Sequence, residues 1–124
     1  MSVVAAAIAV TVLTALGVLQ VLVAAGRPYG RLVWGGRHET LPRRLRVGSA
    51  LSVLVYAAIA GILAVRAAAP GIAAEWITVL VWIFAAYFAL GVVVNGISRS
   101  RLERAVMTPV CVVLAVCSVV IALA

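Results

Sequence analysis

Four long apolar runs divide the chain, and short segments rich in glycine, proline and arginine separate them. The uncharged runs cover residues 3–25, 47–65, 76–98 and 105–124. They do not alternate between apolar and polar positions as the strands of a membrane barrel do. About 20 apolar residues in succession cross the hydrocarbon core of a bilayer as a helix. The pattern therefore predicts membrane-spanning helices over about 3–25, 42–69, 76–97 and 101–123, with a basic loop at 26–41.

The composition places the chain among integral membrane proteins. Of its 124 residues, 67% are hydrophobic and only 10% are charged, whereas soluble domains have about 25% charged residues. A small soluble domain must cover its core with a polar shell, and this chain cannot supply one. The first run lacks a basic segment before it and is too long for the apolar part of a signal peptide, so we expect it to be retained. We expect an all-α, single-domain bundle of four transmembrane helices.

The arginines are distributed unequally between the two ends of these helices. Nine lie in the segments after the first and third helices, and these are Arg27, Arg31, Arg37, Arg43, Arg44, Arg46, Arg99, Arg101 and Arg104. Only Arg66 lies at the opposite end, together with Glu75. Because cytoplasmic loops carry the excess of Lys and Arg, we expect both basic loops in the cytoplasm and both termini outside. The predicted location is the cytoplasmic (inner) membrane, crossed in multiple passes.

The net charge of +7 raises the question of a partner. A basic chain can bind nucleic acid, but here the arginines flank apolar spans instead of lining a soluble face, so we expect no nucleic-acid partner. Arginine near a bilayer attracts anionic headgroups. We therefore predict that the nine loop arginines contact anionic membrane lipids or a protein partner. Arg66 is expected to snorkel toward the outer interface.

Local signals mark the helix ends. Ser100 and Glu103 form an S-x-x-E capping box, in which Glu103 would reach back to the cap while Ser100 caps the fourth helix. Glu103, with Arg104, is also placed to pair with the arginines of the first loop. Pro42 suits the first turn of the second helix. Pro109 is expected to bend the fourth helix, with Thr108 satisfying groups that the bend frees.

Small residues at helical spacing predict where helices meet, since close packing drives helix association in lipid. The clearest such row is on the second helix, at Ala50, Ala57, Gly61, Ala64 and Ala68. A second row on that helix is Ser49, Ser52, Tyr56 and Ala60. Two usable faces would fit a bundle that also self-associates, so we expect a homo-oligomer or a larger membrane-protein partner.

Polar residues inside the apolar runs are candidates for a binding site, because such residues are costly in a membrane. Gln20 and Asn95 lie in the cytoplasmic halves of the first and third helices. With Ser49, Ser52, Tyr56 and Tyr87 they would line a small polar pocket open to the cytoplasm. The alternative is that they only make hydrogen bonds between helices.

No arrangement of catalytic or metal-binding residues is visible. Cys111 and Cys117 lie about 120° apart on one helix and read as packing residues, while His38 and Glu39 are adjacent in a loop with no third partner. We therefore predict no metal, no cofactor and no catalytic residue. The absence of a charge in mid-membrane argues against a proton-coupled pump.

The segments AGRPYGRLVWGGRHETLPRRLRVGS and NGISRSRLERAVMTP resemble a group of small four-helix bacterial membrane proteins of actinobacterial type, which is itself uncharacterised. The residues that carry the resemblance are Gln20, Gly26, Pro28, Gly30, Gly35, Gly36, Leu41, Pro42, Arg46, Asn95, Ser98, Ser100, Glu103, Arg104 and Pro109. The resemblance implies the four-helix architecture and no particular chemistry.

Three functions remain as hypotheses. The first is a non-enzymatic membrane module, acting as an accessory or scaffold subunit or interacting with lipid through its arginine-rich loops. The second is an oligomeric pathway for a small solute or ion, built around Gln20, Tyr56 and Asn95. The third is a membrane-embedded lipid enzyme that uses tyrosine, His38 or Glu103.

Overall fold

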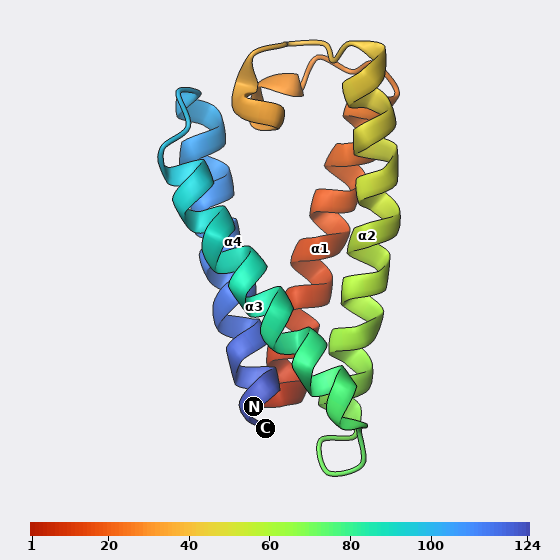
Figure 1. The fold of residues 1–124 in the computed structure, drawn as a ribbon. Coiled ribbons are helices and arrows are strands. Elements are labelled where there is room, and N and C mark those ends of the chain that lie inside the picture. Colours follow the sequence, from red (N-terminus) through yellow and green to blue (C-terminus); the bar gives the residue numbers. More distant parts are fainter.

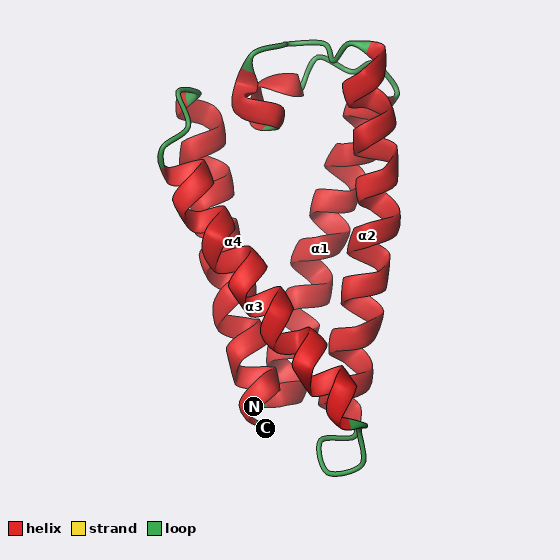
Figure 2. Cartoon of the chain, in the orientation of Figure 1, coloured by secondary structure: helices red, strands yellow, loops and turns green.

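The computed structural model describes all 124 residues and contains four long helices and no strand (Figure 2). The helices are α1 (Ser2–Ala24), α2 (Arg43–Ala68), α3 (Glu75–Gly96) and α4 (Arg101–Leu123). Each is long and apolar enough to span a membrane, which confirms the expected all-helical architecture. Two short 3-10 turns, η1 (Gly30–Leu32) and η2 (Trp34–Gly36), lie in the segment between α1 and α2.

The four helices form two antiparallel pairs. α1 packs along α2 and α3 packs along α4, whereas α1 and α4 meet over a shorter stretch and α2 barely contacts α3. The two pairs lie close together at the end that carries both termini and the 69–74 turn, and they spread apart toward the 25–42 segment (Figure 1). The molecule therefore has one closed end and one open end.

The main core fills the closed end. Ala9, Leu63 and Ile121 come from three different helices and are fully buried there. Alanines on α1, including Ala5 and Ala9, keep its inner face thin, so neighbouring helices approach closely, as small residues allow in membrane bundles. A second, smaller core lies near the open end, where residues of the 25–42 segment pack on α1 and α4.

Arg66 does not snorkel outward, contrary to the prediction. Its side chain is 4% exposed and its Nε donates to Thr78 Oγ1 at 3.0 Å. Its Nη2 donates to the carbonyl oxygens of Ala122, at 3.3 Å, and Ala124, at 2.6 Å. The last carbonyls of a helix have no partner within the helix and carry the negative end of its dipole, so they draw the guanidinium inward. Arg66 thereby ties α2 to α3 and α4.

The small-residue row of α2 does not form a packing face within the chain. Ala50, Ala57, Gly61, Ala64 and Ala68 are all exposed. The inward face of α2 instead carries larger side chains such as Ile59 and Leu63, which are buried and make more dispersion contacts than alanine. Any association through the small-residue row must therefore involve a partner outside this chain.

Only one of the two hydrogen bonds of a capping box forms at the N-terminus of α4. Ser100 Oγ accepts a hydrogen bond from the Glu103 backbone N–H at 3.3 Å, as predicted, but the Ser100 N–H bonds to Ser98 Oγ. The Glu103 carboxylate is therefore free to act elsewhere. Further along, α4 runs through Pro109 as one helix. Thr108 Oγ1 is buried without a hydrogen-bond partner, so the role predicted for this hydroxyl is wrong.

Candidate functional site

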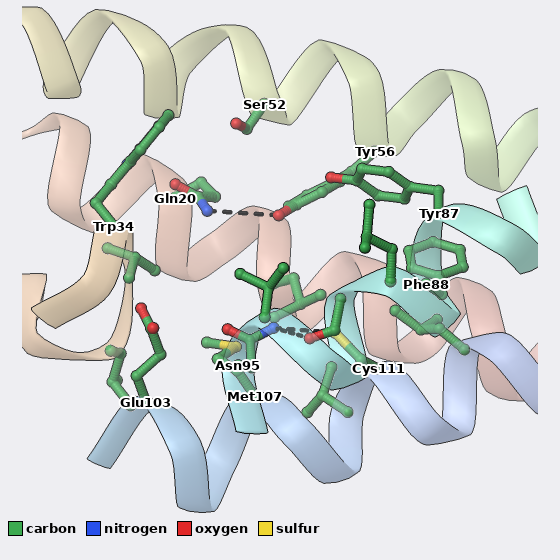
Figure 3. A pocket seen from close by; sticks show the side chains of 18 residues that line it. Gln20, Trp34, Ser52, Tyr56, Tyr87, Phe88, Asn95, Glu103, Met107 and Cys111 are labelled. Carbon is green, nitrogen blue, oxygen red and sulfur yellow. Dashed lines mark hydrogen bonds between the residues drawn. The ribbon is translucent and has the colours of Figure 1, made fainter. Parts of the chain in front are cut away.

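A cavity of about 320 Å³ lies between the two helix pairs at the open end (Figure 3). All four helices and the η1–η2 segment contribute to it, and most of the lining side chains are apolar. Its size is at the lower end of the range typical of small-molecule sites. The lining residues are Leu16, Gln20, Leu32, Val33, Trp34, Ser52, Tyr56, Tyr87, Phe88, Leu90, Gly91, Val94, Asn95, Glu103, Met107, Val110, Cys111 and Leu114.

The η1–η2 segment closes the cavity at its loop end. Trp34 has a positive φ of 53°, a left-handed conformation that a bulky residue rarely adopts. Its indole Nε1 donates to Ser49 Oγ of α2 at 2.9 Å. Trp34 is followed by Gly35 and Gly36, also at positive φ. A Cβ on Gly36 would collide with the Ser100 side chain, so glycine is needed where this turn meets α4.

Two hydrogen bonds fasten the same segment to α4. The Gly35 backbone N–H donates to Glu103 Oε2 at 2.9 Å, and Ser100 Oγ donates to the Arg31 carbonyl at 2.8 Å. Glu103 is 5% exposed. The predicted link between Glu103 and the first loop therefore exists, but it runs to a backbone amide of that loop. The segment bridges α2 and α4 across the mouth of the open end.

Polar groups line one region of the otherwise apolar cavity. Gln20 is 6% exposed, and its Nε2 donates to Tyr56 Oη at 3.5 Å, while its Oε1 has no partner. Asn95 Nδ2 donates to the Gly91 carbonyl at 2.8 Å and contacts Cys111 Sγ at 3.4 Å. Figure 3 shows the Gln20–Tyr56 and Asn95 bonds at the cavity wall.

Five of the six residues predicted to form a polar pocket do line this cavity, namely Gln20, Ser52, Tyr56, Tyr87 and Asn95. Ser49 does not, because it is fully buried behind the Trp34 indole to which it is bonded. The sequence predicts no pocket role for Trp34 and places Glu103 in a cap, so both are missed as parts of the cavity. The one available signal was the Gly35–Gly36 pair, which allows the chain to fold Trp34 back over the helices.

The cavity is open to the surface beside α3. Tyr87 and Leu90 of α3 line it and are 53% and 61% exposed, so it opens where α3 diverges from α2. It does not reach the fully buried layer of Ala9, Leu63 and Ile121, none of which lines it. Within one chain the cavity is therefore a lateral pocket and not a passage through the bundle.

A second hollow, of about 460 Å³, lies on the outside of the η1–η2 segment. Four arginines line it: Arg31 and Arg37 from the first basic loop, and Arg99 and Arg101 from the second. All nine loop arginines are exposed, but these four are brought to one place by the bonds that join the two loops. We call these four residues, with the backbone of 35–36 and Ser100 between them, the arginine hollow.

The remaining loop arginines do not line this hollow. Arg46 Nε donates to the carbonyl of Ala24, the last residue of α1, at 2.7 Å. Arg104 Nη1 donates to the Ser98 carbonyl at 2.9 Å. Arg27, Arg43 and Arg44 are exposed elsewhere on the loop end. The two cysteines are free thiols.

No family model, curated protein or solved structure matches this chain. A function must therefore be argued from the cavity, the arginine hollow and the four apolar helices themselves.

Proposed function

We propose that this chain is a small, non-enzymatic module of the cytoplasmic membrane that binds anionic lipid headgroups at the arginine hollow. The basic loops would face the cytoplasm and the ends of the chain the outside. The observation that carries the proposal is the convergence of Arg31, Arg37, Arg99 and Arg101, from two separate loops, on one hollow.

Charge and geometry favour an anionic phosphate ligand. The guanidinium group offers a planar fork of donors that matches phosphate oxygens. Arg101 is the first residue of α4 and Arg99 and Ser100 directly precede it, so they lie at the helix N-terminus, where the helix dipole favours a negative charge. Each arginine near the surface of an anionic leaflet contributes about 1 kcal/mol. Four of them around one headgroup make a selective site.

Native mass spectrometry of the chain released from nanodiscs tests this proposal. The nanodiscs contain equal parts of phosphatidylglycerol, which is anionic, and phosphatidylcholine, which is zwitterionic. We expect the wild-type chain to retain phosphatidylglycerol preferentially. The double variant Arg37→Gln/Arg101→Gln should weaken that retention by up to about 30-fold, which corresponds to about 2 kcal/mol.

The matched control is Arg43→Gln/Arg44→Gln, which removes the same charge from outside the hollow. It should lose less than a third of the preference. If both double variants lose the preference equally, the arginines act only as a diffuse surface charge and the site is refuted.

Reporter fusions test the orientation. Nine arginines against one favour the basic loops inside, so a periplasm-active reporter joined after residue 124 should be active, and one inserted at Glu39 should be silent. The opposite pattern would contradict the proposed orientation and would remove the arginine hollow from the anionic cytoplasmic leaflet.

The exposed small-residue row of α2 supports an additional role in assembly. Close backbone approach through such rows drives helix association in lipid. Crosslinking in native membranes should trap a homodimer or a larger partner, and Gly61→Leu should reduce the trapped species more than Val55→Leu, an exposed position about 120° away around the helix. An equal yield for both variants would exclude the row as the contact.

A further inference from the structure

The cavity between the helix pairs contains a polar group that the protein itself leaves unsatisfied. Gln20 is 6% exposed, and its Oε1 has no hydrogen-bond partner. Its amide nitrogen makes one long hydrogen bond, of 3.5 Å, to Tyr56 Oη. Leaving a buried carbonyl oxygen without a donor is costly. Gln20 Oε1 therefore marks a place where a donor from outside the chain would be stabilised.

Tyr56 supplies a hydrogen-bond donor next to Gln20. Its Oη accepts the Gln20 bond, and its own proton is not donated to any group of the chain. The Tyr56 proton and the Gln20 carbonyl oxygen are thus an unused donor and an unused acceptor on two side chains that touch each other. A hydroxyl group both accepts and donates, so it can bond to both side chains at once.

Two other polar side chains of the cavity already donate hydrogen bonds within the chain. Ser52 Oγ donates to the Gly48 carbonyl at 3.0 Å, and Asn95 Nδ2 donates to the Gly91 carbonyl. No arginine lines the cavity, and its one charged side chain is Glu103, which is bonded to Gly35. An anionic group here would meet a carboxylate and no cation, so the cavity favours an uncharged ligand.

The remainder of the cavity selects an apolar body. Leu16, Met107, Val110 and Leu114 are among the apolar side chains that line it. The volume of about 320 Å³ holds roughly ten groups the size of water. The opening beside Tyr87 and Leu90 is on the side of the apolar helices, so a ligand would enter from the bilayer.

We propose that this cavity binds an uncharged amphiphile of the alcohol class, whose hydroxyl group accepts from Tyr56 Oη and donates to Gln20 Oε1 and whose alkyl body fills the apolar part. This site is separate from the arginine hollow, because the η1–η2 segment lies between them. It takes a neutral ligand where the hollow takes an anionic one.

Photolabelling in phosphatidylcholine nanodiscs tests the proposal. The probe is decanol with a diazirine in its chain, and the label is mapped by mass spectrometry. We expect adducts at Leu16 and Val110 in the cavity, in excess of those at Leu54, which is 68% exposed on the outside. Competitors are decanol, decane and decanoate, which share one chain length and differ in the end group, compared at equal mole fraction in the bilayer.

Decanol should displace the cavity label at about one-tenth the mole fraction that decane requires, because one satisfied hydrogen bond changes affinity by about that factor. Decanoate should be no better than decane. Gln20→Leu and Tyr56→Phe should each remove the advantage of decanol. Ser52→Ala, which alters a lining residue whose hydroxyl is already bonded, should keep it.

Three results would overturn the proposal. One is equal competition by decanol and decane, which would make the cavity ordinary apolar space. Another is preferred competition by decanoate, which would make it an anion site. The third is a decanol advantage that survives in Gln20→Leu and Tyr56→Phe, both checked for the wild-type melting temperature. Arg37→Gln/Arg101→Gln should leave all these ratios unchanged, so failure of the lipid headgroup proposal is seen separately.

Discussion

The two ends of this bundle use different means to hold the same four helices. At the closed end, alanines and fully buried leucine and isoleucine pack the helices together, and Arg66 satisfies the last carbonyls of α4. At the open end the pairs diverge, and a folded-back loop segment bridges them through Trp34 and Gly35. The closed end therefore contains most of the packed core, whereas the open end contains the cavity.

The largest loss of stability is expected when the Arg66 guanidinium is removed from the closed end. Arg66→Leu leaves Thr78 and the terminal carbonyls of α4 without their donor, and hydrogen bonds to charged groups are each worth about 1.5–3 kcal/mol. We expect the free energy of unfolding in detergent to fall by about 3 kcal/mol, with the melting temperature as the readout. Arg66→Lys should restore only part of the loss, because an ammonium lacks the planar fork.

The exposed Arg101 provides the control for that experiment, since Arg101→Leu removes the same charge from the open end. Its free energy of unfolding should stay within about 0.5 kcal/mol of wild type. A comparable loss in the two variants would mean that Arg66 acts through net charge and not as a tie between helices.

The contact of the bridge with α2 can be disturbed at Gly48. A Cβ at Gly48 would lie 2.9 Å from Trp34 Cζ2, so Gly48→Val must push the indole away from Ser49. We expect a loss of about 1–3 kcal/mol, as for overpacking elsewhere, and a shift of Trp34 fluorescence in a chain whose other tryptophans are replaced by phenylalanine. Gly61→Val, where nothing lies within 4 Å of the added Cβ, should leave that emission unchanged.

A smaller effect is expected at Glu103. Glu103→Leu removes the acceptor for the Gly35 amide, a bond to a charged group, and should cost about 1–2 kcal/mol. Hydrogen exchange of the 30–36 amides should accelerate, while exchange in α2 stays slow. Glu39→Leu, in the same loop and exposed, should do neither. Unchanged protection in Glu103→Leu would show that the segment is held without this carboxylate.

The smallest effect is predicted at Thr108, whose hydroxyl is buried without a partner. Thr108→Val keeps the shape and removes an unsatisfied polar group, which is nearly neutral or stabilising. We expect a gain of up to about 1 kcal/mol in thermal unfolding. Ser118→Ala, which removes a bonded hydroxyl, should not show this gain. A clear loss in Thr108→Val would mean that the hydroxyl has a partner in lipid.

The helices and their ends could be predicted because they depend on runs of apolar residues and on local caps. The four helix ranges expected from the sequence differ from the observed bounds by one residue at most. The grouping of Gln20, Tyr56 and Asn95 in one pocket could be predicted because each is a polar residue in an apolar helix. Such residues face inward.

Other features could not be read from the sequence because they depend on where the helices diverge. The row of small residues on α2 looked like the inner face, but larger side chains fill that position. Arg66 looked like an interfacial residue, and only the end of α4 beside it explains its burial. Trp34 and Glu103 joined the cavity through the left-handed turn at 34–36, a tertiary contact that no local pattern encodes.

Solid-state NMR on deuterated protein in protonated membrane lipids from the producing cells tests the central claim most directly, by following proton transfer from lipid to side-chain carbons. The account predicts transfer to Leu16 inside the cavity as well as to the exposed Leu54, and none to Leu63 in the closed end. Transfer to Leu54 alone would show that the open end holds no membrane-derived ligand and would contradict the account.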